Sequence, residues 1–226
     1  MTKKILIVLT NMPTYGQADD ATGLWLGEAT EFIDEFRDSD VTFDYVSPHG
    51  GYVPVDPRSL KFADENIFGY YRSSDFQNRA LRNSKRPAEI NPADYVAIYY
   101  TGGHGVMWDF PHDNGLAQIA QTIYQQGGYL SSVCHGIAGL FFLQNDQGQS
   151  LITGKNITGF TTTEEYLSGK FKKIPFWNEK VAQEQGASFK KARAYKPFAI
   201  QDDRIITGQN PFSPRQTARL LRAAIQ

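Results

Sequence analysis

The chain has 226 residues, of which 41% are hydrophobic and 21% are charged. This length suits one large domain or two small ones, and the apolar fraction excludes a disordered chain or a highly charged coiled coil. With 23 Lys and Arg residues against 24 Asp and Glu residues, the net charge is −1, so binding of nucleic acid is not indicated. The single cysteine, Cys134, excludes an intrachain disulfide framework and a cysteine-rich zinc site.

The first residues predict a buried strand rather than a targeting segment. The apolar run Ile5–Leu9 is five residues long. A secretory segment needs roughly 7–15 apolar residues, and a membrane helix needs about 20. We therefore expect a cytoplasmic protein without a membrane partner.

The first third of the chain begins with a strand–helix–strand pattern. Ile5–Leu9 is rich in β-branched residues, as is typical of strands buried on both faces. Leu24–Phe36 carries apolar residues at helical spacing, and Val41–Val46 alternates like a strand. Residues 47–92 are irregular and rich in turn residues, with a short helix expected at Asp75–Asn83, and we interpret them as an insertion.

Regular elements return after residue 92. The pattern predicts strands at Tyr95–Tyr100, at Tyr129–Val133, within Ile152–Phe160 and at Arg204–Gly208, and helices at Gly115–Gln126, Lys180–Gln185 and Pro214–Ile225. Alternating strands and helices predict a three-layer α/β sandwich around a mostly parallel central sheet. Without a repeat or a linker, we expect residues 1–226 to form a single domain.

Cys134 lies in a turn that is typical of a catalytic nucleophile. Ser132–Gly136 has a small residue two positions before the cysteine and a glycine two positions after it, at a junction between a strand and a helix. The N–H groups of that helix are expected to lower the pKa of the thiol. A lone cysteine is usually a small buried apolar residue. Here the turn, the glycine and the adjacent His135 favour a nucleophile.

A cysteine nucleophile also needs a base and a group that orients the base. The other histidines are His49, His104 and His112, and all three precede Cys134. The class I amidotransferase arrangement, in which a His-x-Glu follows the cysteine, therefore cannot be built from this chain. This leaves His135 as the natural base.

A glycine-rich turn follows the strand at Tyr95–Tyr100. The backbone N–H groups of Gly102–Gly105 would lie at the carboxyl end of the sheet, where they could hold an oxyanion. A phosphate-binding loop is disfavoured because the turn lacks the Lys-Ser/Thr ending. His104 within this turn is open to a second interpretation, as a structural hydrogen-bonding residue.

These motifs resemble the glutathione-independent glyoxalases (glyoxalase III), in the heat-shock chaperone branch of the ThiJ/PfpI superfamily. The matching stretches occur in family order over nearly the whole chain: Thr22–Glu28, Ser47–Gly51 with Asp56–Pro57, Gly102–Gly105 with Trp108–Phe110, Val133–Gly136, Gly159–Thr161 with Glu164–Glu165, and Thr207–Pro211. The resemblance implies a class I glutamine amidotransferase-like, flavodoxin-like fold.

The resemblance also implies roles for particular residues. It places the nucleophile at Cys134, the base at His135 and the acid of the triad at Glu165, with Glu164 as the alternative. A buried glutamate that shares a proton with the nucleophile falls on Glu28. Taken alone, Glu28 and the Glu164–Glu165 pair would each be interpreted as solvated residues at a helix start.

The implied oxyanion and substrate-binding residues are Gly102, Gly103 and His104, together with the backbone of His135. Two features depart from the family pattern: His49 in its loop, and the segment Tyr195–Phe198. These features bear on substrate preference more than on the chemistry.

The implied activity is conversion of methylglyoxal or glyoxal to D-lactate or glycolate, without glutathione, a metal or another cofactor. The partner would be a small 2-oxoaldehyde, and a homodimer is left open. One alternative is a holdase chaperone or stress protein in which Cys134 is a redox sensor, and a large exposed apolar patch would favour it. A second alternative is a protease, an amidase or a protein deglycase on the same fold.

Overall fold

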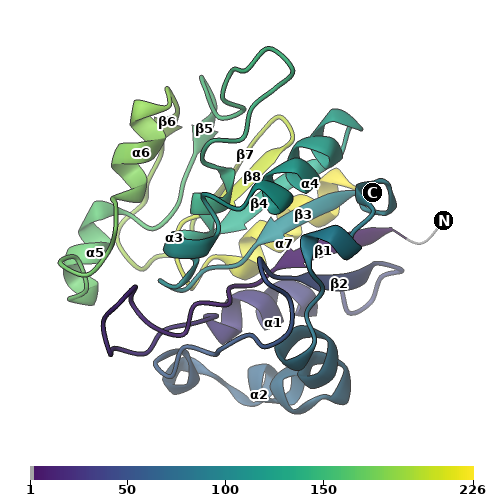
Figure 1. Cartoon of the computed structure of the whole chain (residues 1–226), viewed down its shortest axis with the longest axis vertical. Helices are drawn as coiled ribbons and strands as arrows, with labels where there is room; N and C mark the ends of the chain where they lie inside the picture. The colour runs from purple at the N-terminus through teal and green to yellow at the C-terminus, as the bar shows by residue number, and fades with distance from the viewer. Residues whose placement is uncertain (1–2) are drawn as a thin grey trace.

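The computed structural model describes residues 3–226 and is built on a six-stranded sheet (Figure 1). The strand order is β2-β1-β3-β4-β8-β7. Five strands are parallel, namely β1 (Lys4–Val8), β2 (Thr42–Val46), β3 (Ala97–Tyr100), β4 (Tyr129–Val133) and β8 (Ile205–Gly208), and β7 (Ala199–Asp202) is antiparallel at the edge. The parallel strands bring their carboxyl ends to one edge of the sheet, where ligands of open α/β sheets bind.

Apolar side chains cover both faces of this sheet. On one face Leu6 and Ile98 pack with buried residues of α4 (Asn114–Gln125), and on the other Ile7 and Tyr99 pack with α1 (Leu26–Asp34) and α7 (Pro214–Ala224). The strands are therefore buried on both sides, which explains their continuous apolar runs. This arrangement confirms the predicted three-layer α/β sandwich with a mostly parallel sheet.

A group of smaller elements lies beyond the β7 edge of the sheet, in green in Figure 1. The group contains α5 (Thr162–Ser168), α6 (Asn178–Glu184) and the short parallel strands β5 (Asn156–Ile157) and β6 (Ser188–Phe189). The helix α3 (Val106–Asp109) follows the glycine-rich turn after β3. Sequence patterns did not predict α3, β6 or β7, all of which are short, and indicated only the start of α5, at Glu164–Glu165.

Residues 47–92 are more regular than expected. They contain α2 (Glu65–Arg72), a π-helical segment at Phe76–Arg82, and 3₁₀ turns at Ser59–Phe62, Pro87–Glu89 and Pro92–Asp94. The expected helix at Asp75–Asn83 corresponds to the π-helical segment. The prediction of no element at α2 was wrong: the Asp64 side chain caps this helix at Ile67 N (2.8 Å). Ile67 is the only buried residue of α2, and Tyr70 and Tyr71 are partly buried against the same core, so the apolar stripe of this helix is short.

The remaining predicted elements lie within about two residues of the observed ones. Among residues 3–226, no helix is long and apolar enough to cross a membrane.

Candidate active site

Cys134 lies at the tip of the sharp turn between β4 and a 3₁₀ helix at Cys134–Leu140. Its φ angle is 57°, in the left-handed region that non-glycine residues rarely adopt, so the predicted backbone strain is present. A Cβ atom on Gly136 would lie 2.3 Å from Tyr100 O, which explains the glycine two positions later. The cysteine is free and its side chain is buried.

His135 and Glu165 continue from Cys134 as a chain of contacts. His135 Nδ1 lies 3.3 Å from Cys134 Sγ, and His135 Nε2 lies 2.6 Å from Glu165 Oε1. All three side chains are buried. Burial by itself would raise the pKa of Glu165, but the contacts with His135 and His104 outweigh burial and lower this pKa to about 2. The structure thus places an ionised carboxylate against the imidazole that faces the thiol.

His104 contacts the other oxygen of the same carboxylate. His104 Nε2 lies 3.2 Å from Glu165 Oε2, and His104 Nδ1 lies 3.1 Å from Arg58 Nη2. Arg58 in turn binds Asp56 through two nitrogen–oxygen contacts of 3.1 and 2.6 Å. Burial, followed by the nearby His135, lowers the pKa of His104 to about 4. A continuous line of contacts therefore runs from Asp56 to His135.

Glu28 reaches the site from the first turn of α1. It is fully buried, and its Oε2 accepts a hydrogen bond of 2.7 Å from Gly102 N. Its carboxyl group is a neighbour of the Cys134 thiol, and each group affects the pKa of the other. Burial raises the pKa of Glu28 to about 8 despite these hydrogen bonds. The expectation of a solvated Glu28 from helix position alone was therefore wrong, because its carboxyl group is buried beside Cys134.

The expectation that the turn lowers the pKa of the thiol was wrong. Burial, and then the adjacent Glu28 carboxyl group, raise the pKa of Cys134 well above its usual range. The following helix is a 3₁₀ helix rather than an α-helix, and the N–H of His135 lowers this pKa too little to offset the burial. Both groups therefore keep their protons near neutral pH, and ionisation of one would oppose ionisation of the other, because two adjacent anions repel.

The glycine-rich turn supplies space as well as backbone donors. The N–H of Gly102 is already donated to Glu28, and a Cβ atom at this position would lie 2.6 Å from Glu28 Oε2. Gly103 has a φ of 102° and lines the cavity above Cys134. Gly102 N and both ring nitrogens of His104 thus have partners within the protein.

Glu164 has no hydrogen bond with His135 and instead connects several segments of the chain. It is fully buried, so the expectation that Glu164 is a solvated residue at the start of α5 was also wrong. Its carboxyl group accepts hydrogen bonds of 2.8–2.9 Å from Thr161 N, Thr161 Oγ1, Tyr195 N, Gln209 Nε2 and Asn210 Nδ2. Glu164 thus ties α5 to the Tyr195 segment and to the loop after β8.

A cavity of about 470 Å³ opens above Cys134. Its lining is Trp25, Arg58, Lys61, Phe62, Gly103, His104, Cys134, His135, Phe160, Ser168, Tyr195, Pro211 and Phe212. His49 and His112 are not among these residues: His49 N binds Asn11 Oδ1 (2.8 Å), and the His112 ring stacks on Phe142. Arg58 was not predicted, although it directly follows the Asp56–Pro57 motif.

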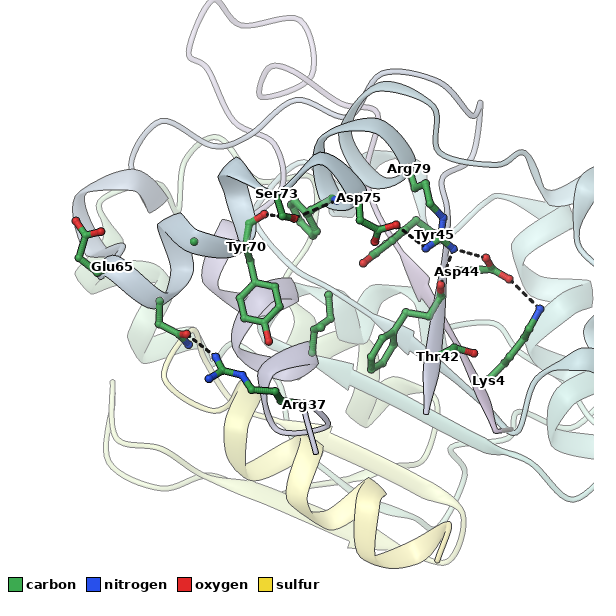
Figure 2. Close-up of a pocket in the computed structure, with 15 residues that line it drawn as sticks. Lys4, Arg37, Thr42, Asp44, Tyr45, Glu65, Tyr70, Ser73, Asp75 and Arg79 are labelled. Carbon is green, nitrogen blue, oxygen red and sulfur yellow. Dashed lines mark hydrogen bonds and ion pairs between the residues drawn. The ribbon is translucent and has the colours of Figure 1, made fainter. Parts of the chain in front are cut away.

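A second, larger cleft lies apart from this chemistry (Figure 2). It has a volume of about 680 Å³ and lies between β2, α2 and the π-helical segment. Several of its charged side chains are paired with one another: Asp44 lies close to Lys4 (3.5 Å) and to Arg79 (2.6 Å), as Figure 2 shows. We place the chemistry in the smaller cavity, which contains the cysteine.

One group of potential metal ligands occurs among residues 3–226, at His104, His135 and Glu165. A tetrahedral zinc ion with bonds of 2.0–2.1 Å keeps its ligand atoms roughly 3.3 Å apart. The 2.6 Å separation of His135 Nε2 and Glu165 Oε1 is instead that of a strong hydrogen bond. These side chains are therefore placed to hold and move a proton.

Comparisons with solved structures define the class of the fold. DJ-1β of Drosophila melanogaster is 14% identical, with a TM-score of 0.62 over 99% of this chain and 90% of that chain, a likeness of fold alone. The 24 kDa Rapid Encystment Protein of Francisella tularensis is 32% identical, with a TM-score of 0.95 over 99% of both chains. The fold is thus the flavodoxin-like fold of the DJ-1/ThiJ/PfpI class. No protein-family model matches the chain.

Curated relatives identify the family within this class. Glyoxalase 3 of Candida albicans is 34% identical over 99% of this chain and 98% of that protein. The glutathione-independent glyoxalase HSP31 of Saccharomyces cerevisiae is 35% identical over 96% of this chain and 95% of that protein. The crystal structure of glyoxalase III from C. albicans has a TM-score of 0.87 at 31% identity, over 99% and 97% of the two chains. The chain belongs to the glutathione-independent glyoxalases.

Proposed function

We propose that this protein converts methylglyoxal to D-lactate, and glyoxal to glycolate, without glutathione. The observation that carries the proposal is the buried chain of contacts from Cys134 through His135 to Glu165, with Glu28 beside the thiol, at the base of one cavity. The membership of the family supports the same reaction class.

In the proposed mechanism the substrate is both oxidised and reduced. The sulfur of Cys134 adds to the aldehyde carbon and forms a hemithioacetal. His135 removes the proton from that carbon and returns a proton to the neighbouring carbon through an enediol. The former aldehyde carbon becomes a thioester while the ketone is reduced to an alcohol. Water then cleaves the thioester, which releases the 2-hydroxy acid and regenerates the thiol, so no external oxidant or reductant is needed.

The electrostatics of the site support these roles. The low pKa of Glu165, about 2, keeps this carboxylate ionised beside His135, where it stabilises the imidazolium that forms when the base takes a proton. The raised pKa of Glu28, about 8, lies nearer to that of the thiol than the pKa of an ordinary carboxyl group does, so the ionised fraction of Glu28 can accept the thiol proton as the sulfur attacks. The N–H groups of Gly103 and His135 would hold the developing oxyanion.

The burial of Cys134 favours an enzyme over a redox sensor. Its side chain is 3% exposed and is enclosed by charged and aromatic groups. A sensor thiol is usually accessible to solvent, whereas Cys134 is buried beneath the cavity. We further propose a small 2-oxoaldehyde as the substrate. We propose the cytoplasm as the location, because its reducing conditions would keep the nucleophile Cys134 as a thiol.

The direct test is turnover by the purified protein. Methylglyoxal should disappear and D-lactate should accumulate in equal amounts, at the same rate with and without added glutathione. D-lactate would be measured with a stereospecific dehydrogenase. Turnover that requires glutathione, or loss of methylglyoxal with no D-lactate, would refute the proposal.

Glu164 and Glu165 should respond differently to the same substitution. Glu165→Gln removes the charge that stabilises the His135 imidazolium, and we expect kcat to fall roughly 100-fold. The His135 ring can shift its proton to Nδ1 and accept from the new amide, so we expect a smaller loss of stability than in Glu164→Gln. Glu164→Gln presents an amide N–H₂ to a carboxyl site where only donors converge, at a cost of about 1–3 kcal/mol. Urea unfolding and steady-state kinetics on both variants would check this, and a Glu164→Gln variant that is stable but inactive would reverse the assignment.

A further inference from the structure

We propose that His104 is a positioning residue: Arg58 holds it in one tautomer, and in that tautomer it aims the Glu165 carboxylate at His135. The proposal deepens the proposed function, because it concerns a residue that acts through Glu165 on the base. It also gives a role to residues 47–92, which contribute Arg58 to the site.

The tautomer follows from the partners of the two ring nitrogens. A guanidinium group only donates hydrogen bonds, so His104 Nδ1, at 3.1 Å from Arg58 Nη2, must be the acceptor. In a neutral imidazole the proton is then on Nε2. That N–H donates to Glu165 Oε2 at 3.2 Å, and Glu165 Oε1 is left to accept from His135 Nε2 at 2.6 Å.

The neighbours of His104 keep it neutral. Arg58 and His135 face the imidazole from two sides, Glu165 faces Nε2, and the Tyr15 ring lies 5.0 Å from the His104 ring. Burial and the adjacent His135 lower the pKa of His104 to about 4. A protonated His104 would also direct a second N–H at the Arg58 guanidinium. His104 therefore acts as a fixed donor and does not compete with His135 for the proton that is transferred.

Arg58 is itself held rigidly by a buried carboxylate. Asp56 has no exposed surface, and it accepts from the Arg58 backbone N (2.9 Å), from the Arg58 guanidinium and from Thr22 Oγ1 (3.1 Å). The guanidinium also lies over the rings of Tyr15 and Trp25, at 5.5 and 5.8 Å. Each oxygen of Glu165 thus has one fixed histidine donor, and the carboxylate has little freedom to rotate away from His135.

The discriminating experiment compares His104→Gln with His104→Leu. A glutamine can donate through Nε2 to Glu165 and accept through Oε1 from Arg58, whereas a leucine fills a similar volume and can do neither. We expect His104→Gln to keep kcat within about threefold of wild type. We expect His104→Leu to lower kcat by roughly 10–100-fold, the usual cost of losing such a supporting contact, with KM within about threefold. Equal losses in both variants, with both folded by circular dichroism, would overturn the proposal.

A spectroscopic measurement tests the tautomer independently of turnover. In ¹⁵N-labelled protein, the ring nitrogens of His104 should report a neutral imidazole that is protonated at Nε2 between pH 6 and 8. In Asp56→Asn/Arg58→Gln, which removes both charges together, this preference should weaken. A wild-type His104 that is protonated at Nδ1 would refute the proposal. If the tautomer is as expected but no methylglyoxal is consumed, the proposed function fails while the geometry of the contacts stands.

The control is a second arginine–aspartate pair of the same length. Arg79 Nη2 and Asp44 Oδ1 are 2.6 Å apart in the cleft of Figure 2, away from Cys134. Asp44→Asn/Arg79→Gln should therefore leave kcat and the signals of His104 unchanged. If this double variant lowers kcat as much as Asp56→Asn/Arg58→Gln does, loss of a pair alone explains the effect and the positioning role is rejected.

Discussion

Cys134→Ser should abolish methylglyoxal turnover and leave the thermal midpoint within a few degrees of wild type. A hydroxyl is close in size to a thiol, so the packing around residue 134 is kept. It is a far weaker nucleophile at neutral pH, because a hydroxyl loses its proton much less readily than a thiol. D-lactate formation and differential scanning fluorimetry on the same preparation would check both parts. Turnover at the wild-type rate would remove Cys134 from the mechanism.

Substitution of the base, His135, should reduce turnover without abolishing it. His135→Ala should lower kcat by roughly 10²–10⁴-fold, the usual contribution of a positioned general base. His112→Ala is a suitable control, because His112 stacks on Phe142 and is not part of the cavity lining. An unimpaired His135→Ala variant would require a different base.

The sequence was informative where the signal is local. A β-branched run such as Ile5–Leu9 predicts a buried strand because parallel strands lie inside two layers of helices. The small residue and the glycine around Cys134 predicted a strained turn because bulk at Gly136 would meet Tyr100 O. In both cases the signal lies within a few adjacent residues of the sequence.

The sequence was less informative where contacts are long-range. Nothing near Arg58 in the sequence shows that its guanidinium meets His104, 46 positions away. Glu164 and Glu165 are adjacent in the sequence. Only the fold shows that Glu164 accepts a hydrogen bond from Asn210, whereas Glu165 faces His135. The raised pKa of Cys134 was missed for the same reason, since it depends on burial and on Glu28, which comes from α1.

Glu28→Gln should make the free energy of unfolding less dependent on pH, and it should also impair turnover. The pKa of Glu28 is raised from 4.5 to about 8 in the folded protein, so the folded state binds the proton more tightly than the unfolded state. The stability from this group is fully present below about pH 4.5 and is lost as the pH rises through about 8. At ~1.4 kcal/mol for each pKa unit, the loss amounts to several kcal/mol.

Glutamine has no such proton to lose, and its amide oxygen can still accept the hydrogen bond from Gly102 N. The free energy of unfolding of Glu28→Gln, measured in urea at pH 5 and pH 8.5, should therefore exceed that of wild type by more at the higher pH. Turnover should fall sharply, because the amide cannot take the thiol proton. The control is Glu65→Gln, which changes an exposed glutamate in the first turn of α2. Parallel pH profiles for wild type and Glu28→Gln, together with full activity, would exclude Glu28 from the site.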